Sequence, residues 1–434
     1  MRFSFVVIFS LLSHGLLSQD SLFSAKDAVN LALQQNLEIQ IAQSDLEIAT
    51  INNNWGNAGK WPLITANVSN TEALSNINQK LSNGSSIVRN NVSNNNFNTN
   101  VAISWRVFNG LRVRSTKERF ESIEKMGSIA LQQQIDQVVF DVLNIYNNII
   151  RLKKQLSATT AIIDLSKERL KIAETRFNVG SGAKTDMLQA KIDLNAQEVN
   201  LQNIYKQLDN TRAGINTMLK RKPDDLFIAK DDQFIIPVIN YANVVEKLEK
   251  QNYQLLLAEQ EKINILIDKK IINSQRMPTA TLSSVTNLTK TKAGAGFFLT
   301  NQTFGPNLGI GIGIPIFNGN INKTQLKVNG VQQKQQSLQT ELLKSSLQRD
   351  LLIAFQEYQN ANSVSKIEET NVKFAEENNM ISTERFRKLQ SNSIELRQAQ
   401  LSLIEAQDRF INAQYRAQVA AYTLLYLTGE ISKQ

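Results

Sequence analysis

The chain has 434 residues, and its 48 lysines and arginines against 39 aspartates and glutamates give a formal net charge of +9. It has no cysteine, which excludes disulfides, thiolate nucleophiles, sulfur-bound metals and a lipidated N-terminal cysteine. Its one histidine, His14, lies in a segment that we expect to be removed, so histidine-based triads and most zinc sites are excluded too. We therefore expect no enzyme and no cofactor or metal site. Basic and acidic residues alternate along the predicted helices, which is typical of solvated faces and predicts no binding of nucleic acid.

The first 18 residues have the features of a secretory signal peptide. Arg2 precedes an apolar run from Phe3 to Leu12, which is too short to span a bilayer. The alternative is a buried N-terminal strand or helix. No later segment reaches the length of apolar sequence that a membrane helix needs. We expect an exported protein that is either soluble outside the inner membrane or crosses a membrane as a β-barrel.

The next segment predicts one helix and two strands. The helix is expected from Ser24, a suitable N-cap, to about Asn54, and Trp61-Pro62 ends it. Residues 64–69 and 101–107 alternate between apolar and polar side chains, which predicts two short strands. Residues 70–98 between them are rich in Asn and Ser, and we predict a long polar loop there.

A long helix is predicted from about Leu111 to Phe177, because no proline interrupts it and every seventh position is apolar. These positions are Ile135, Val142, Ile149, Leu156, Ile163, Leu170 and Phe177. A seam of this period makes a coiled coil, and the helix would be roughly 100 Å long. Residues 178–182 form a glycine-containing tip, and a returning helix is expected from Thr185 to about Lys220.

The second half of the chain repeats the landmarks of the first. Two pairs lie 216 positions apart: Gln34-Gln35-Asn36 with Lys250-Gln251-Asn252, and Trp61-Pro62 with Met277-Pro278. Two more lie 209 positions apart: Phe108-Asn109-Gly110 with Phe317-Asn318-Gly319, and Arg176-Phe177 with Arg385-Phe386. Shared offsets indicate an internal duplication. We expect a signal peptide at 1–18, a first repeat at 19–222, a connector at 223–240 and a second repeat at 241–434.

The second half contains the clearest strand. Five aliphatic residues alternate with glycines or stand next to Pro315: Leu308, Ile310, Ile312, Ile314 and Ile316. Each glycine would cost a helix about 1 kcal/mol, so a strand with one aliphatic face is favoured. We expect this face to contact lipid; the alternative is a strand packed on a soluble core, for which the sequence offers no separate apolar layer. A weaker partner strand is expected at about 279–286, with a glycine-containing loop between the two.

The predicted fold is mainly α with a membrane β-barrel portion. Four strands per chain cannot close a barrel, and an open edge in lipid leaves backbone groups unpaired. Three copies would supply twelve strands, an even number within the range of outer-membrane barrels. Alanine at every seventh position of the last helix, from Ala399 to Ala420, permits close approach of neighbouring helices. An ordinary alanine-rich coiled coil would show the same stripe.

The chain resembles the TolC-like outer membrane efflux proteins over essentially its whole mature length. The resemblance rests on the duplication, on Phe108-Asn109-Gly110 and Pro315-Ile316-Phe317-Asn318-Gly319 after the strands, and on the tip from Arg176 to Gly180 that leads to Asp186-Met187-Leu188. It implies a homotrimer with a β-barrel in outer-membrane lipid and long antiparallel coiled-coil helices forming an α-barrel across the periplasm. It also implies partners: a periplasmic adaptor (membrane fusion) protein and an inner-membrane transporter.

The resemblance also points to residues at the periplasmic entrance. An arginine and two aspartates of the family's second tip fall on Ser391, Glu395 and Gln398, of which only Glu395 is charged. With Asp186 of the first tip, these are the expected entrance residues, and three copies of Glu395 would favour cations. The alternative for both acids is stabilisation of a helix N-terminus by about 0.3–1 kcal/mol. Any opening motion is expected at the second tip, whose long helix has the less regular seam.

The expected adaptor contacts lie at the ends of the two tips: Val179, Gly180, Ser181, Gly182, Leu389 and Gln390. A tight chain reversal is an alternative reason for the glycines. The predicted function is a passive export duct of a tripartite efflux or type I secretion system, because the chain has no nucleotide-binding loop of its own. The alternative is a structural periplasmic coiled-coil or adhesin scaffold without transport. A scaffold has no use for a lipid-facing aliphatic strand.

Overall fold

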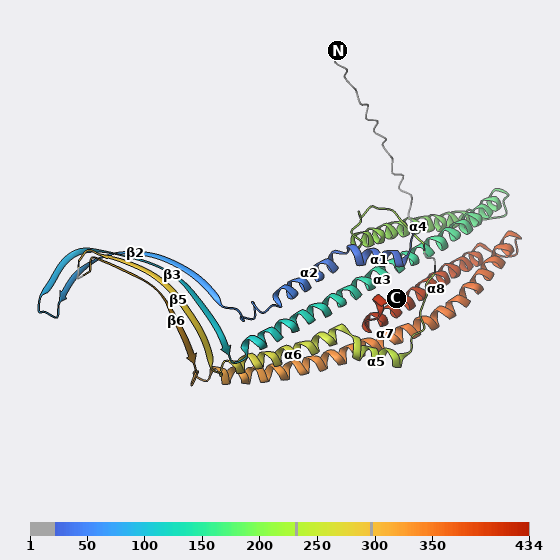
Figure 1. Ribbon diagram of the computed structural model, residues 1–434. Helices are drawn as coiled ribbons and strands as arrows, with labels where there is room; N and C mark the ends of the chain where they lie inside the picture. Colours follow the sequence, from blue (N-terminus) through green and yellow to red (C-terminus); the bar gives the residue numbers. More distant parts are fainter. Residues whose placement is uncertain (1–21, 231–232, 296–297, 434) are drawn as a thin grey trace, which may run out of the picture. The chain divides into compact units, whose positions relative to one another are not determined.

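A computed structural model describes residues 22–230, 233–295 and 298–433 (Figure 1). The predicted signal peptide, residues 1–18, lies outside the described residues. The main elements of the first half are α1 (Ala25–Gln35), α2 (Leu37–Asn52), β2 (Leu63–Lys80), β3 (Ser86–Asn109), α3 (Arg112–Asn178) and α4 (Lys184–Met218). Those of the second half are α5 (Tyr241–Gln251), α6 (Tyr253–Ser274), β5 (Thr279–Ala293), β6 (Thr300–Gly313), α7 (Ile321–Arg387) and α8 (Ser393–Leu427). A short parallel pair, β1 (Leu22–Phe23) with β4 (Ile228–Ala229), and a 3-10 turn at Ile431–Lys433 complete the described chain.

The chain forms two compact units, and both halves of the sequence contribute to each. The helical unit contains the described residues up to Ile41, Gln132–Asn252 and the residues from Ser345 on. The sheet unit contains Ala42–Leu131 and Tyr253–Lys344.

The predicted long helix is confirmed as α3, and its seam faces the interior of the helical unit. Val142, Ile149 and Ile163 are buried, while Phe177 at the end is partly exposed. α3 and α7 have 67 residues each and start 209 positions apart, at Arg112 and Ile321. α4 and α8 have 35 residues each and again start 209 positions apart, at Lys184 and Ser393.

The single helix predicted from Ser24 to about Asn54 is wrong, because Asn36 divides it into α1 and α2. Ser24 does cap α1 in a reciprocal bond pair with Asp27. Asn36 has an extended backbone, and its Oδ1 accepts from the N–H of Glu38 at 2.8 Å while its Nδ2 donates to the carbonyl of Met218 at 3.0 Å. The side chain thus caps the new helix and binds the end of α4, which a hydrophobic pattern does not reveal.

A four-stranded antiparallel sheet in the order β2-β3-β5-β6 dominates the sheet unit. The polar loop predicted at 70–98 is wrong: β2 and β3 pair through almost all of it, and only residues 81–85 connect them. Polar cross-strand bonds hold this part together, among them those that Ser93 and Asn95 donate to the carboxylate of Glu72. The strand β5 likewise extends beyond residue 286 to Ala293, and Gly305 of the expected second loop lies in β6 opposite Asn287. Strand pairing overrides the low strand propensity of Asn and Gly.

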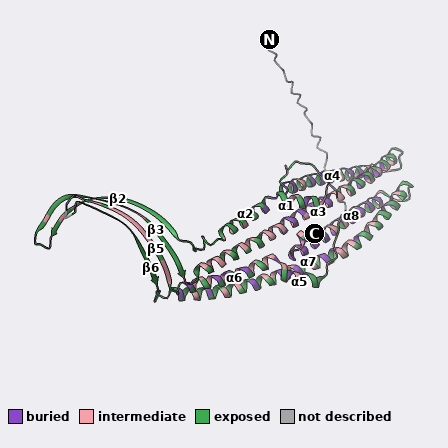
Figure 2. Cartoon of the chain, viewed as in Figure 1, coloured by how far each residue is buried: buried purple, intermediate pink, exposed green. Residues whose placement is uncertain are grey.

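The register of the sheet separates apolar from polar side chains, since alternate residues point to opposite faces. The apolar face carries Ile64, Ala66 and Val68 of β2, Val101, Ile103 and Trp105 of β3, Ala280 and Leu282 of β5, and Leu308, Ile310 and Ile312 of β6. The opposite face carries Thr65, Asn67, Ser69, Asn98, Asn100, Ser283, Asn287, Asn307 and glycines of β6. Most of the apolar side chains are exposed, as the colouring of β2 and β6 shows in Figure 2.

The aliphatic strand predicted to run to Ile316 ends earlier, at Gly313. Pro315 has no N–H to donate, so the ladder stops before it. Ile314 and Ile316 lie beyond the strand but remain exposed, at 65% and 96%. No helix of the described residues is both long enough and apolar enough to cross a membrane.

The second long helix has two apolar faces in the helical unit. Leu347 and Leu351 of α7 are buried, and so are Ala399, Ala406, Ala413 and Ala420 of its hairpin partner α8. Ile367, Phe374 and Ile381 lie on α7 with about half or more of their surface exposed. The described part of the chain leaves this second apolar face uncovered.

Candidate functional site

The two helical hairpins of the helical unit, α3–α4 and α7–α8, end in tips of the same design. Residues 179–183 connect the first pair of helices, and residues 388–392 connect the second. Each tip reverses at a residue with positive φ: Gly180 at 78° and Leu389 at 61°. The following N–H groups close the turn, since Ser181 donates to the carbonyl of Arg176 at 2.9 Å and Gln390 to that of Arg385 at 2.8 Å.

The tips differ at the reversal itself. Gly180 adopts the left-handed conformation at no steric cost, whereas Leu389 adopts it with a side chain, which costs roughly 1–2 kcal/mol. Leu389 is also 66% exposed, so its side chain gains little by burial within this chain. The second tip therefore carries a backbone strain that the first tip does not have, and burial of Leu389 within the described chain offsets little of it.

Most of the residues expected to contact an adaptor are exposed. Val179, Gly180, Ser181, Leu389 and Gln390 are open to solvent, and Gly182 is half-buried. A Cβ on Gly182 would come within 2.8 Å of the Cβ of Arg176, so a glycine is needed there for the turn.

The expected entrance residues occupy two different hairpins. Glu395, in the first turn of α8, forms an ion pair with Arg385 of its own hairpin at 2.9 Å. Ser391 is half-buried and Gln398 is exposed, both on the same hairpin. Asp186 lies in the first turn of α4, on the other hairpin. The structure thus brings three of the four residues together and gives Glu395 a cationic partner.

The hairpins contact each other just behind the tips. The guanidinium of Arg176 lies 3.9 Å from the centre of the Phe386 ring and donates to the carbonyl of the same residue. Burial lowers the pKa of Arg176, against the opposing attraction of Asp186. Farther along, Arg387 of α7 pairs with Glu168 of α3.

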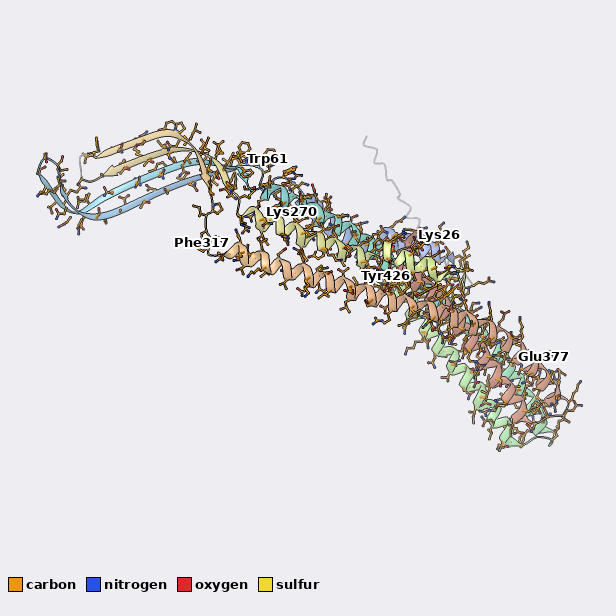
Figure 3. All side chains as sticks on the ribbon, turned by 90° about the horizontal axis from the view of Figure 1, so that it is seen from below. Lys26, Trp61, Lys270, Phe317, Glu377 and Tyr426 are labelled. Carbon is orange, nitrogen blue, oxygen red and sulfur yellow. The ribbon has the colours of Figure 1, made fainter. Side chains whose placement is uncertain are left out.

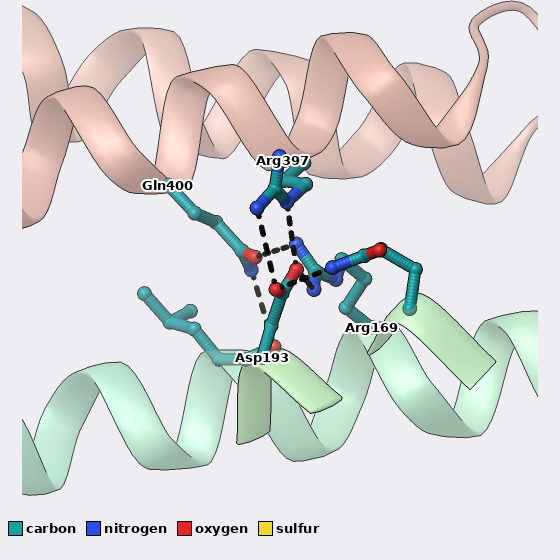
Figure 4. A network of polar contacts seen from close by, with 6 residues as sticks. Arg169, Asp193, Arg397 and Gln400 are labelled. Carbon is teal, nitrogen blue, oxygen red and sulfur yellow. Dashed lines mark hydrogen bonds and ion pairs between the residues drawn. The ribbon is translucent and has the colours of Figure 1, made fainter. Parts of the chain in front are cut away.

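A polar network, the Asp193 network, connects the hairpins about two turns from the tips (Figure 4). Asp193 of α4 accepts from Arg169 of α3 and, at 2.9 Å, from the Nε of Arg397 of α8. Arg169 also donates to the Oε1 of Gln400 at 3.0 Å, and Gln400 donates to the carbonyl of Leu165 at 3.3 Å. One carboxylate therefore holds cations from both hairpins.

The charge state of this network is set by its surroundings. Burial by itself would raise the pKa of Asp193, but hydrogen bonds from Arg397, Arg169 and Gln189 outweigh burial and lower it. The side chain of Arg169 is only 3% exposed, so the carboxylate compensates a buried cation. Asp193 stays ionised at neutral pH, and the contact between the hairpins depends on its charge.

The sequence analysis missed the Asp193 network. The signal was a set of charged residues next to leucines at helical spacing: Arg169 before Leu170, Asp193 before Leu194 and Arg397 after Leu396. Opposite charges beside the seams of two hairpins could have been paired, but periodicity does not tell which helices are neighbours.

Comparison with known proteins supports the architecture. A sequence model of the outer membrane efflux protein family matches residues 28–219. The outer membrane efflux protein BepC of Brucella suis biovar 1 (strain 1330) is 19% identical over 335 residues, which cover 76% of this chain and 72% of BepC.

Solved structures have the same fold at low sequence identity. The outer membrane protein VceC of Vibrio cholerae superposes with a TM-score of 0.75 and 15% identity, over 93% of this chain and 96% of VceC. The CmeC outer membrane channel of Campylobacter jejuni gives 0.76 and 14%, over 94% and 85%. Residues 28–219 therefore match the outer membrane efflux protein family, and more than nine-tenths of the chain, 93–94%, has the fold of solved outer membrane channels.

Proposed function

We propose that this chain is one of three identical subunits of a passive export duct, whose strands form a twelve-stranded barrel in the outer membrane. The observation that carries the proposal is the four-stranded sheet, with one exposed apolar face and two edges, β2 and β6, that find no partner within the described chain. An unpaired edge in lipid costs several kcal/mol for each backbone group, so copies must pair edge to edge. The polar face would then line the duct.

Engineered cysteine pairs test this closure directly, because the natural chain has no cysteine. Ala66→Cys on β2 is combined in turn with Leu308→Cys, Ile310→Cys or Ile312→Cys on β6. We expect one pairing to give covalent trimers on a non-reducing gel. The control pair, Val101→Cys with Thr286→Cys, lies on directly opposed residues of β3 and β5 and should give only an intrachain bond. Absence of cross-linked trimers from all pairings, with the control bond formed, would refute the barrel.

An internal duplication is part of the proposal. It is supported by the matched lengths of α3 with α7 and of α4 with α8. Asn252 separates α5 from α6 as Asn36 separates α1 from α2. Its Nδ2 donates to the carbonyl of Leu427, at the end of α8, at 2.9 Å. The exposed apolar face of α7 fits helices of neighbouring copies, which would complete a hollow wall.

We propose that the tips dock to a periplasmic adaptor and that an inner-membrane transporter drives export. The exposed Val179 and Leu389 are the best positions for a photo-reactive residue, and Ile192, which is 60% exposed on α4, is a matched control away from the tips. We expect adaptor capture from the two tip positions and not from Ile192. Equal capture at all three would contradict docking through the tips.

Glu395 is proposed to line the entrance, with its charge partly balanced by Arg385. Single-channel recordings should show a lower preference for cations in Glu395→Ala and a higher preference in Arg385→Ala. Glu405→Ala, which removes a more exposed carboxylate farther along α8, is the control. Unchanged selectivity in both tip variants would exclude this role.

The Asp193 network is proposed to hold the second hairpin against the first and so to keep the entrance narrow. Its position behind both tips, and its bonds from α3 and α4 to α8, support this role.

A scaffold without transport, the rival function, explains the helices but gives no use to the exposed apolar face of the sheet.

A further inference from the structure

A basic cavity of about 690 Å³ lies in the sheet unit, where β6 leads into α7. Its lining joins Arg276, which follows α6, with the segment Pro315–Phe317 and with Asn322, Lys323 and Lys327 of the first turns of α7. Figure 3 labels Phe317 at this point. The lining contains three cationic side chains and no carboxylate.

The cations of this cavity are not neutralised by any acid among the described residues. Within the part of the chain that the structure describes, Arg276, Lys323 and Lys327 form no ion pair. The first N–H groups of a long helix have no partners in the helix and carry partial positive charge, so the start of α7 adds to the field. All of these groups favour a bound anion.

A buried side chain points to a ligand independently of the charges. Asn322 lines the cavity, is only 6% exposed, and its Oδ1 has no hydrogen-bond partner. Leaving a buried polar atom unpaired is costly. A bound polar group would satisfy this amide, which can present either its oxygen or its N–H groups.

The corresponding place in the first half is neutralised. Arg114 and Glu118 stand 209 positions before Lys323 and Lys327, so one lysine has an acid as its counterpart. Glu118 pairs with Lys270 at 2.7 Å and with Arg114 at 3.6 Å. The cationic cavity is thus particular to the second half and is not a general feature of the strand-to-helix turn.

We propose that this cavity binds the phosphate group of an anionic phospholipid of the periplasmic leaflet. The inference rests on the proposed function, which places the sheet in the membrane. A lipid is favoured over free phosphate because Ile316 and Phe317, 96% and 77% exposed, stand beside the cations and continue from the apolar face of β6. The charges would hold the head group while these side chains contact the glycerol and acyl chains.

The test uses the full-length protein in nanodiscs of phosphatidylcholine with a minor fraction of phosphatidylglycerol. After mild delipidation, native mass spectrometry counts the phosphatidylglycerol retained per protein. At roughly fivefold per basic residue near an anionic surface, Lys323→Gln/Lys327→Gln should retain the lipid about 25-fold less tightly. Arg114→Gln, at the neutralised counterpart, should retain it as the natural chain does. Millimolar inorganic phosphate should not displace the lipid.

Three results would overturn the inference. Equal retention in the double variant excludes the site, and displacement by inorganic phosphate alone identifies a site for free anions. A double variant that keeps its lipid but falls apart on size exclusion shows that a second copy of the chain covers the cavity. Channel conductance, recorded on the same samples, separates the two proposals: a conducting trimer without bound lipid contradicts this inference only, whereas a chain that neither assembles nor conducts contradicts the duct.

Discussion

Replacing Asp193 by alanine should loosen the contact between the two hairpins while leaving each hairpin folded. The substitution removes the carboxylate that accepts from Arg169 and Arg397. It leaves the apolar seam of α4 intact, because the neighbouring Leu194 remains buried.

The size of the effect follows from the burial of the partners. Removing one member of a buried ion pair costs about 3–5 kcal/mol, since the other charge stays buried and unpaired. Arg169 is in this position, but Gln400 still accepts one of its hydrogen bonds, so the lower end of the range applies. Arg397 is 43% exposed and adds no more than about 1 kcal/mol. We expect a loss of about 3 kcal/mol in the free energy of local opening.

Hydrogen exchange measures this opening. A loss of about 3 kcal/mol corresponds to roughly 150-fold faster exchange if the hairpins open locally. The acceleration should appear in peptides from 184–196 and 393–404, and not in the core of α3 around residue 146. Single-channel recordings should show longer or larger openings in the same variant.

The control is Asp209→Ala on the same helix, where an exposed carboxylate pairs with Arg212 at 3.3 Å. It should change exchange little, because exposed pairs contribute little to stability. Replacing Asp193 by leucine together with Arg169→Met should restore much of the protection, since apolar residues can replace a buried pair. Identical exchange in Asp193→Ala and Asp209→Ala would refute the role assigned to the network.

Three further predictions concern the hairpins and the helix breaks. Leu389→Gly should relieve the left-handed strain of the second tip and slow its hydrogen exchange roughly fivefold, for about 1 kcal/mol; faster exchange would show that the side chain is needed. The pKa of Asp193 is lowered from 3.8 by folding, so its contribution is full above about pH 4 and is lost as the pH falls through the folded-state pKa; conductance recorded on acidification should rise only below that point, and a rise near pH 6 would implicate other groups. Asn252→Ala should cost about 1–3 kcal/mol by leaving the carbonyl of Leu427 unpaired, and thermal unfolding should show a lower midpoint, whereas an unchanged midpoint would mean that water replaces the amide.

Local patterns determined the helices of this protein. The seven-residue seam of α3, the absence of proline and the glycines at the first tip predicted a 67-residue helix to within a residue at each end. This succeeded because the helical period is a local property that depends on neighbours only through the need to bury one stripe. The break at Asn36 was not predicted, because it depends on a hydrogen bond to the carbonyl of Met218, which is far away in the sequence.

Pairing between distant segments decided the sheet. Residues 70–98 have the composition of a loop, and only their alignment with one another and with β5 makes them strands. The same register gathers apolar residues of four strands on one face, although β5 taken alone shows little of this alternation. The residues that pair across strands are far apart in the sequence, so the apolar and polar pattern along one strand does not predict which residues will pair.

The features of the candidate site were likewise predicted only in part from the sequence. The sequence by itself located both tips and their short reversals, because glycines, helix starts and repeated landmarks are local signals. Only the tertiary structure showed that Glu395 pairs with Arg385, that Asp193 holds cations from both hairpins and that three cations line one cavity with Asn322. The effect of a charged side chain depends on its ion-pair partner and on how far it is removed from water. Both depend on how the helices pack against one another, which the order of residues along one helix does not reveal.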